Sequence, residues 1–437
     1  MNDKMIFGVS LSLALVMASV ITPVGRSAAN SESAYEVWVV DQSDTTTDGG
    51  GTLYIYQGDT LTGQDAAIAV PEMIDLGGAA RSLCLAQTGT APRRPHIILF
   101  NAAHSHAILA FVATGHVLFM DAATRAPVAC LDVGAQAHAA FPSPDQTYVL
   151  VANQNGKLLQ RINTNYAANT FALDSTATLD LATCTTPNGV ACQDAILRPD
   201  NAPIFPIIEA TSHFTFVTLR GGGLFIVDST ATPMAIVAEY DKVTIHPNGL
   251  YGVETSGKMY VNSGGGTPSN PLESDLYAIS LSGLTTTPNP PNTPSPTLIF
   301  SHDARGFVDS HGAALTKHGG FIWVADRAAN RIVVVDTASG MVVNEIDLIS
   351  AVSGDPAPDL MAISPNGNRV FITLRGPNPL TGNVLGVNNA VRSTPGLGIM
   401  RVERNGERGV LQAIAPITHI VSGVERADPH GLAVRLK

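Results

Sequence analysis

Four histidines and two aspartates recur at comparable places along the chain, each beside a short run of apolar residues. They are His96, His138, Asp241, His311, Asp359 and His430. The histidines lie in the segments RPHIILF, QAHAAFP, DSHGAAL and DPHGLAV. Imidazole and carboxylate groups are natural ligands for zinc, copper or iron, and an incomplete protein shell leaves a position for water or substrate. These residues could therefore bind a metal ion if the fold brings their segments together.

The composition predicts an all-β protein made of many short strands and turns. Of the 437 residues, 45% are hydrophobic and 14% are charged, and the chain contains 40 Gly and 28 Pro. Apolar runs such as YVLVANQ, FIWVADR and RVFITLRG are bounded by turn residues, and almost none shows a helical period. The formal net charge of -11 argues against a nucleic-acid partner, whose binding surface needs concentrated positive charge.

The N-terminal segment predicts export. Residues 5–21 form an apolar run after Lys4, and small residues offer a cleavage site after Ala29. Residues 1–29 are therefore interpreted as a signal peptide. Because no second hydrophobic span follows, residues 30–437 are expected to be periplasmic or secreted, without a membrane span.

Four cysteines in an exported protein predict two disulfides. Cys184 and Cys192 bracket a short turn-rich loop and form the favoured pair, which would leave Cys84 to pair with Cys130. The sequence alone leaves all three connectivities open. The spacing matches no metal or redox motif, so a structural role is expected.

Self-similarity along the chain predicts a repeat architecture. Segments 137–162, 202–221 and 357–376 share one register, in which two strands flank a turn of the Ser-Pro-Asn-Gly type or its substitute. Segment 310–346 adds a third and a fourth strand, and four strands in roughly 40–50 residues is the size of a propeller blade. Six blades are expected at 94–133, 137–181, 202–240, 241–281, 310–348 and 357–418.

The two ends of the chain are expected to share a seventh blade. Residues 35–77 supply three strands without a leading one, whereas residues 428–437, DPHGLAVRLK, read like such a first strand. Pairing of this tail with YEVWVVDQ would close the ring without a free sheet edge. The predicted fold is a single seven-bladed β-propeller closed by its C-terminal strand. The expected surface loops are 78–93, 182–201, 262–275, 284–297 and 377–397.

The repeats resemble the YVTN-type repeats of exported seven-bladed propellers. The matching segments are SPDQTYVLVAN, RIVVVDTASG, SPNGNRVFIT and DPHGLAV. The resemblance covers most of the mature chain and implies the propeller superfamily of quinoprotein amine dehydrogenase, nitrous oxide reductase and lactonase-like proteins. It implies an architecture rather than one activity, because these propellers include lactone hydrolases, copper and haem oxidoreductases, and proteins that only bind or scaffold.

The propeller register places the candidate residues at one mouth of the central channel, where the first strands begin. In blade order the equivalent residues are His430, His96, His138, Ile204, Asp241, His311 and Asp359. Within this set, His311, Asp359 and His430 come from neighbouring blades and form the tightest predicted group. The adjacent Asp309 and Asp428 could orient an imidazole.

Second strands return to the same mouth and bring arginines with them. The clearest candidates are Arg220, Arg327 and Arg375, which could hold a carboxylate or phosphate on a ligand by paired hydrogen bonds. A structural role is the alternative for both residue types. A histidine at this place can hydrogen-bond the neighbouring blade, and an arginine can bind loop carbonyl groups.

Three functions are compatible with these residues. The first is an exported protein that binds a transition metal, zinc or copper, or a small anionic ligand at the channel mouth. The second is an enzyme of the same fold, either a metal-assisted hydrolase of lactones or esters or a copper oxidase, with Asp241 or Asp359 as base. The third is a scaffold whose loops contact protein partners that the sequence does not identify.

Overall fold

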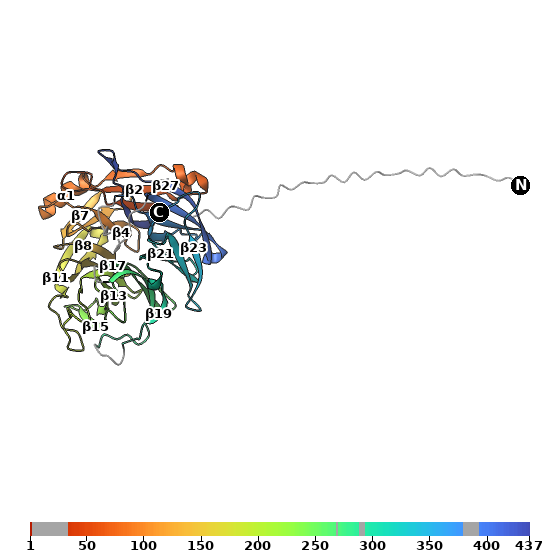
Figure 1. Cartoon of the computed structure of the whole chain (residues 1–437). Coiled ribbons are helices and arrows are strands. Elements are labelled where there is room, and N and C mark those ends of the chain that lie inside the picture. Colours follow the sequence, from red (N-terminus) through yellow and green to blue (C-terminus); the bar gives the residue numbers. More distant parts are fainter. Residues whose placement is uncertain (2–33, 268–269, 288–292, 379–392) are drawn as a thin grey trace. The chain divides into compact units, whose positions relative to one another are not determined.

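The structure, a computed structural model, describes residues 1, 34–267, 270–287, 293–378 and 393–437. The chain divides into two units, and the described elements all belong to the second, Ser33–Lys437. Apart from Met1, the predicted signal peptide lies outside the described residues. The described part of the second unit contains seven four-stranded antiparallel sheets and one two-stranded hairpin. The sheets follow one another around this unit in chain order (Figure 1).

Six blades take their four strands consecutively from the chain. Two are β4 (Pro95–Phe100), β5 (His106–Phe111), β6 (His116–Asp121) and β7 (Pro127–Asp132), then β8 (Ala137–Pro142), β9 (Tyr148–Asn153), β10 (Leu158–Asn165) and β11 (Thr170–Asp180). The next are β12 (Pro203–Ile208), β13 (Phe214–Leu219), β14 (Leu224–Asp228) and β15 (Ala235–Tyr240), then β16 (Gly252–Thr255), β17 (Lys258–Thr267), β18 (Asn270–Ser280) and β19 (Thr297–Ser301). The last are β20 (Ser310–Leu315), β21 (Phe321–Asp326), β22 (Arg331–Asp336) and β23 (Met341–Asp347), then β24 (Pro358–Ile363), β25 (Arg369–Leu374), β26 (Gly396–Glu403) and β27 (Arg408–Pro416).

The seventh blade is built from both ends of the chain. Its strands are β3 (Glu72–Asp75), β2 (Thr52–Gln57), β1 (Tyr35–Asp41) and β30 (Pro429–Leu436), in that spatial order. Val37 lies opposite Val434 and Val39 opposite Leu432 in the antiparallel β1–β30 ladder. In Figure 1 the blue C-terminal blade returns to the orange N-terminal one. The prediction of a seven-bladed propeller closed by its C-terminal strand is confirmed.

The composition of each strand follows from its place in the blade. Inner strands such as β8 (AHAAFP) and β20 (SHGAAL) are rich in Ala and Gly, because seven of them converge around one axis. Second strands such as β9 (YVLVAN) and β5 (HAILAF) are buried at every residue, because neighbouring sheets cover both of their faces. A continuous apolar run bounded by turns is typical of such a doubly covered strand.

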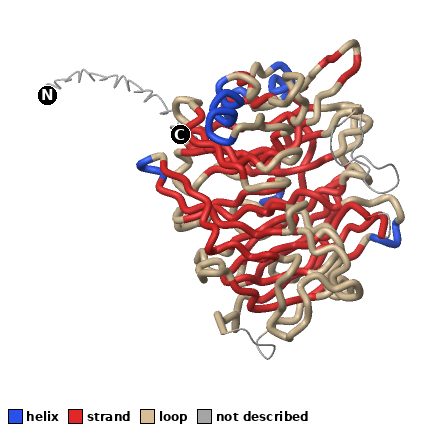
Figure 2. Tube along the Cα trace, turned by 90° about the vertical axis from the view of Figure 1, so that its left-hand side faces the viewer, coloured by secondary structure: helices blue, strands red, loops and turns tan. Residues whose placement is uncertain are grey.

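Three expectations about strand and loop bounds are wrong. The blade expected at 241–281 consists of β16 to β19 and begins at Gly252, because Asp241 starts a turn whose Val243 and Thr244 amides bond its carboxylate. The described residues of segment 262–275, expected as a loop, continue the ladder between β17 and β18. Segment 78–93 contains α1 (Ala79–Thr88), which lies at the edge of the strand-rich unit in Figure 2.

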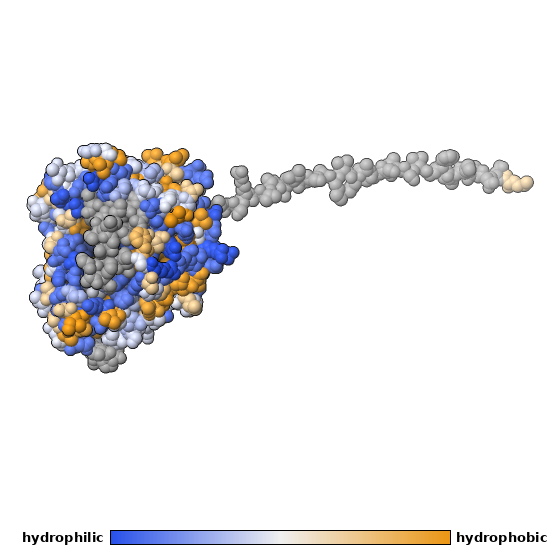
Figure 3. All heavy atoms as spheres, in the orientation of Figure 1, coloured by the Kyte–Doolittle hydropathy of each residue, from blue (hydrophilic) through white to orange (hydrophobic). Residues whose placement is uncertain are grey.

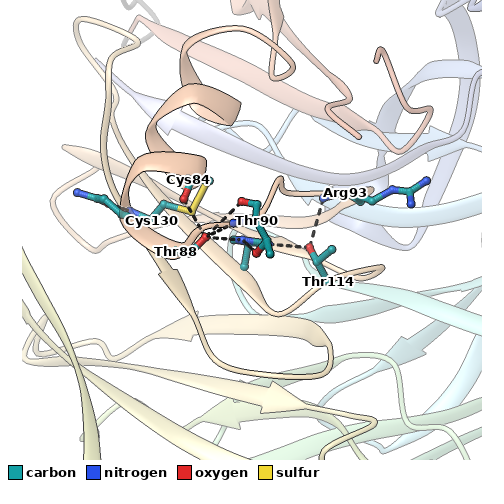
Figure 4. Close-up of a disulfide and its surroundings, with 8 residues drawn as sticks. Cys84, Thr88, Thr90, Arg93, Thr114 and Cys130 are labelled. Carbon is teal, nitrogen blue, oxygen red and sulfur yellow. Dashed lines mark hydrogen bonds between the residues drawn. A yellow bond between two sulfur atoms is a disulfide. The ribbon is translucent and has the colours of Figure 1, made fainter. Parts of the chain in front are cut away.

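Both disulfides follow the favoured pairing. Cys184 pairs with Cys192 across the turn-rich loop, and Cys84 pairs with Cys130. The Cys84–Cys130 bond joins α1 to β7, as Figure 4 shows. Nearby, His116 Nε2 lies 3.0 Å from the Thr88 hydroxyl. The disulfide therefore fixes the helix on the outer part of its blade.

The surface of the described residues is mixed in polarity. Hydrophilic and hydrophobic residues are interspersed over the face shown in Figure 3. The remaining strands form a small hairpin of β28 (Ile420–Val421) and β29 (Val424–Glu425), whose apolar side chains are exposed. No helix within the described residues combines the length and apolar character needed to cross a bilayer.

Glu36 on β1 links the two ends of the chain electrostatically. It is 1% exposed, and its Oε2 atom lies 3.1 Å from Arg435 Nη1. Its Oε1 atom lies 3.0 Å from Lys437 Nζ and 2.5 Å from Arg125 Nη2. Burial opposes ionisation of Glu36, but hydrogen bonds from Trp38, Arg125 and Lys437 lower its pKa from 4.5 to about 2.

Replacing Glu36 should weaken the closure of the ring. We expect Glu36→Gln to lower the free energy of unfolding at pH 7 by roughly 2 kcal/mol, because the largely buried Arg435 and Arg125 and the exposed Lys437 each lose this carboxylate. The folded-state pKa is depressed, so the wild-type advantage should be complete above about pH 4.5 and disappear towards about pH 2. Urea unfolding at several pH values measures this.

Glu72→Gln is the matched control, because Glu72 contacts the same Arg125 but is 46% exposed. Its effect should stay below about 1 kcal/mol. Equal effects of the two substitutions, or a Glu36→Gln effect that persists unchanged at pH 2, would contradict the role given to Glu36.

Candidate functional site

Six inner strands place their second residue around one pocket. These residues are His96 (β4), His138 (β8), Ile204 (β12), His311 (β20), Asp359 (β24) and His430 (β30). A register shift interrupts the ladder at this point in all six strands. An extra residue in one strand bends it and re-aims the side chain. The β-bulge is therefore the local device that directs these side chains out of their sheets.

The pocket has a volume of about 370 Å³ and is lined by residues from most blades. Four predicted histidines, Ile204 and the three predicted arginines line it, and Asp359 contacts His311 directly. Sequence reasoning missed several of its polar and apolar residues. They are Arg94, Gln136, Gln154, Asn248 and Leu250. Arg94 and Gln136 each precede a pocket histidine by two residues, as Asp309 and Asp428 do, and this repeated offset is a signal that could have identified them.

Asp241 does not join the pocket residues. Its expected place at the head of an inner strand is wrong, because its carboxylate accepts backbone hydrogen bonds from Val243 and Thr244 in a turn before β16. The pocket wall of this blade comes instead from Asn248 and Leu250. The assignment of Asp241 as a ligand or a base therefore has no geometric support.

Three side chains form a compact group at the pocket. His311 Nε2 lies 2.8 Å from Asp359 Oδ1 and 3.4 Å from His430 Nε2, and His430 Nε2 lies 3.7 Å from Asp359 Oδ2. All three are fully buried, with side-chain exposures of 5%, 0% and 2% for His311, Asp359 and His430. We call this group the axial triad. It is the group of neighbouring-blade residues that the sequence predicted to be tightest.

Hydrogen bonds fix the direction in which three pocket imidazoles present their lone pairs. His430 Nδ1 lies 3.1 Å from the His96 carbonyl oxygen, and His138 Nδ1 lies 3.0 Å from the Ile204 carbonyl oxygen. His96 Nδ1 lies 2.9 Å from Gln42 Oε1. Since a carbonyl oxygen only accepts, each Nδ1 carries the proton and the neutral ring keeps a lone pair on Nε2.

His311 differs from the other three imidazoles. Its Nδ1 atom has no hydrogen-bond partner among the described residues, whereas Nε2 faces both other members of the axial triad. The metal-free ring therefore carries its proton on Nε2, which can donate to Asp359 or His430. Coordination of a metal through Nε2 would move that proton to Nδ1.

The pocket keeps its imidazoles neutral and its central carboxylate ionised. Burial holds the pKa values of His96 and His430 well below their usual range, lowers that of His311, and lowers that of His138 to about 4. Burial alone would raise the pKa of Asp359, but its contacts with His311, His430 and Arg327 hold it well below its usual range. At neutral pH the Nε2 atoms of His96, His138 and His430 therefore keep a free lone pair, whereas Nε2 of His311 donates its proton to Asp359.

Two arginines hold the central carboxylate in place. Arg375 Nη1 lies 3.0 Å and Arg327 Nη1 lies 3.4 Å from Asp359 Oδ2. Arg327 also lies 2.8 Å from Asp309 Oδ2, and Arg375 donates to Asp428. Both guanidinium groups are 1% exposed. They orient Asp359 through Oδ2 and leave its Oδ1 atom facing His311 Nε2 at 2.8 Å.

Arg220 occupies a more open position at the same pocket. Its side chain is 36% exposed and pairs with Asp200 at 2.5 Å, and Nη1 lies 3.3 Å from Asn155 Oδ1. Of the three predicted arginines, Arg220 thus has the exposure that contact with an external anion requires. Ligand binding by Arg220, Arg327 and Arg375 stays a prediction.

Glycine after the histidine permits the close approach of neighbouring blades. A Cβ atom on Gly431 would lie 2.4 Å from the His96 carbonyl oxygen and 2.9 Å from Ile97 Cα. One on Gly312 would lie 2.4 Å from the Asp359 carbonyl oxygen. The clashing atoms are all backbone, so they cannot move away cheaply. The His-Gly pair therefore combines a ligand-type side chain with room for the next inner strand.

No protein-family model matches the sequence, and no curated protein matches it either. The fold is similar to that of solved structures at low identity. A protein from Lactobacillus plantarum has a TM-score of 0.58 at 12% identity, covering 92% of this chain and 99% of that chain. The periplasmic gluconolactonase of Pseudomonas aeruginosa has 0.57 at 13%, with coverages of 92% and 99%.

A hypothetical selenium-binding protein from Sulfolobus tokodaii has a TM-score of 0.58 at 8% identity, covering 93% of this chain and 94% of that chain. At such identities the likeness shows the fold alone. The chain is a seven-bladed β-propeller. This outcome agrees with the architecture that the YVTN-type resemblance implied, and the function must be argued from the pocket.

Closing the space beside Gly431 should disturb the propeller centre. We expect Gly431→Ala to lower the free energy of unfolding by about 2 kcal/mol, because the added methyl overlaps the backbone of β4. Gly320→Ala is the matched control, since a Cβ atom there meets nothing within 4 Å. Urea unfolding of both variants measures the difference. Indistinguishable values for the two variants would show that the inner strands are not packed as described.

Proposed function

We propose that the protein binds a transition metal ion of the zinc or copper type through His311, His430 and Asp359 of the axial triad. The observation that carries this proposal is the spacing of the ligand atoms: His311 Nε2 lies 2.8 Å from Asp359 Oδ1 and 3.4 Å from His430 Nε2, and one ligand atom from each of the three residues lies within 4.8 Å of the others. Ligands of a tetrahedral zinc ion at about 2.0–2.1 Å from the metal are separated by about 3.3 Å. The triad therefore needs only small adjustments to surround an ion.

The donor chemistry supports the same proposal. Two neutral imidazoles and one ionised carboxylate form a set that suits zinc and copper, and three protein ligands leave a coordination position open. The His96 carbonyl oxygen that binds His430 Nδ1, and the arginines that bind Asp359, act as the outer partners that orient metal ligands. The carboxylates of Asp309 and Asp428, which the sequence predicted as acceptors for an imidazole, pair with Arg327 and Arg375.

A small anion is the natural fourth ligand. Asp309, Asp359 and Asp428 bring three carboxylates against the guanidinium groups of Arg327 and Arg375, so a divalent ion would leave one positive charge in excess. The pocket of about 370 Å³ has room for more than an ion. The exposed Arg220 could hold a carboxylate or phosphate on a ligand that fills the open position.

The two disulfides support a location in an oxidising compartment, since such bonds persist in exported proteins. We therefore place the metal-binding function outside the cytoplasm, in the periplasm or in secreted material. There the protein would capture or carry a metal ion, which requires only the triad and reversible access through the pocket.

A metal-assisted hydrolase of lactones or esters is the second candidate. The observation that favours it is the pocket volume together with the arginine lining, which would accommodate an organic substrate beside the ion. Zinc-loaded protein that hydrolyses members of a lactone panel, with activity lost in His311→Ala, would support this function. If no lactone of the panel is hydrolysed, metal binding without hydrolysis is the function that remains.

Removal of a triad imidazole should abolish tight metal binding. We expect His311→Ala and His430→Ala each to weaken zinc binding at pH 7 by at least about 100-fold, because each removes one of three ligands. Competition against a chromogenic chelator measures the affinity. His213→Ala is the control, since His213 is 38% exposed on a blade surface and pairs with Asp228.

Circular dichroism and the unfolding midpoint of the metal-free variants show whether the fold is kept. A wild-type affinity weaker than micromolar, or equal affinities of the wild type and both triad variants, would refute metal binding by the triad.

A further inference from the structure

A second group of ligand-type side chains lies in the blade of β16 to β19. His246 precedes β16, and Glu273 and Asp275 lie on β18. One ligand atom from each of the three lies within 4.8 Å of the others. Asp275 is 0% and Glu273 is 3% exposed, whereas His246 is about one-third exposed. The group is therefore buried on its carboxylate side and reachable from solvent through the imidazole.

The contacts of this group show an excess of negative charge. His246 Nδ1 lies 2.9 Å from Asp275 Oδ2 and 3.5 Å from Asp303 Oδ2, so one imidazole faces two carboxylates with Glu273 close by. Three carboxylates are therefore gathered around one imidazole.

An unsatisfied oxygen points to a missing partner. Asp275 Oδ2 accepts from His246 and from the Tyr277 hydroxyl at 3.3 Å. Its other oxygen, Oδ1, is buried and accepts no hydrogen bond from any described residue. Buried carboxylate oxygens are normally satisfied, because leaving one without a partner costs about 1–3 kcal/mol or more. A protonated His246 alone bridges the carboxylates but leaves this atom unsatisfied.

We propose that His246, Glu273 and Asp275 form a second divalent-cation site, separate from the axial triad, with Asp303 beside it. A cation there would give the buried Asp275 Oδ1 atom a partner. One imidazole with two carboxylates suits Zn²⁺ or Mn²⁺ and disfavours the thiophilic Cu⁺. The Tyr277 hydroxyl orients Asp275 from outside the ligand set.

The second site stands in the wall of the channel pocket. Asn248, two residues after His246, lines that pocket, and so does Gly265 of β17. The Ser263 hydroxyl on β17 donates to the His246 carbonyl oxygen at 2.7 Å and holds the loop against the sheet. A cation bound by the loop and the sheet together would therefore tie down one wall of the axial pocket. The inference does not depend on metal binding by the triad.

Metal stoichiometry of the full chain tests the inference. Chelator-treated protein is dialysed against Zn²⁺, and separately Mn²⁺, and its metal content is measured by mass spectrometry. In the His311→Ala background, which removes the axial triad, we expect one remaining equivalent of Zn²⁺. That equivalent should be lost, or bound at least about tenfold more weakly, after His246→Gln or Asp275→Asn.

Asp241→Asn is the matched control, because Asp241 lies in the same loop but its carboxylate is bonded by backbone amides. It should leave the stoichiometry unchanged. His246→Gln is a mild change at a partly exposed position, so it guards against loss of folding, which the unfolding midpoint monitors. No retained equivalent in His311→Ala, or one that survives both substitutions, would overturn the second site. If His311→Ala loses its metal while His246→Gln and Asp275→Asn keep theirs, the axial triad accounts for all of the bound metal.

Discussion

Pairing of β30 with β1 is the interaction on which the rest of this structure depends. It brings the last strand of the chain between the N-terminal blade and the channel, and with it His430 and Asp428. The His430 ring then stacks on the His96 ring at a centroid distance of 3.9 Å, and Asp428 meets Arg375 of the preceding blade. Without this ladder the axial triad would lose one of its three members, and Arg375 would lose a counter-charge.

The buried charges at the centre are better explained by function than by stability. Replacing a buried ion pair with apolar residues is often neutral or stabilising, so retention of such groups is weak evidence that they stabilise the fold. Here Asp359 is completely buried, yet it contacts two guanidinium groups and two imidazoles. Clusters of buried titratable groups in a pocket are typical of functional sites. The surrounding arginines fix the carboxylate through Oδ2, while Oδ1 faces His311.

The sequence was sufficient to predict the architecture and the members of the triad. Strand runs bounded by turns gave the blades, and the tail DPHGLAVRLK, read as a missing first strand, gave the closure. The repeat predicted that His311, Asp359 and His430 lie close together, because each occupies the equivalent position at the start of an inner strand. The register worked there because Pro or Ser begins each of these strands one residue earlier.

The remaining errors arise where local hydrogen bonding competes with the repeat. The other candidates lie at the start of an apolar strand, whereas Asp241 comes directly after one. Its carboxylate accepts a backbone hydrogen bond from Thr244 and starts a turn rather than a strand. The group of His246 and Asp275 could not be found from sequence, because strand pairing and a loop fold bring them together across 29 residues. The β-bulges that aim the pocket residues were not predicted either, because a register shift belongs to the pairing of two strands.

The metal-binding claim is tested most directly by anomalous diffraction from crystals soaked in zinc. The account predicts a peak at the channel end, about 2.0–2.2 Å from Nε2 of His311, Nε2 of His430 and Oδ1 of Asp359. An ordered, metal-free triad that keeps its hydrogen bonds, with anomalous density only at other places, would contradict it.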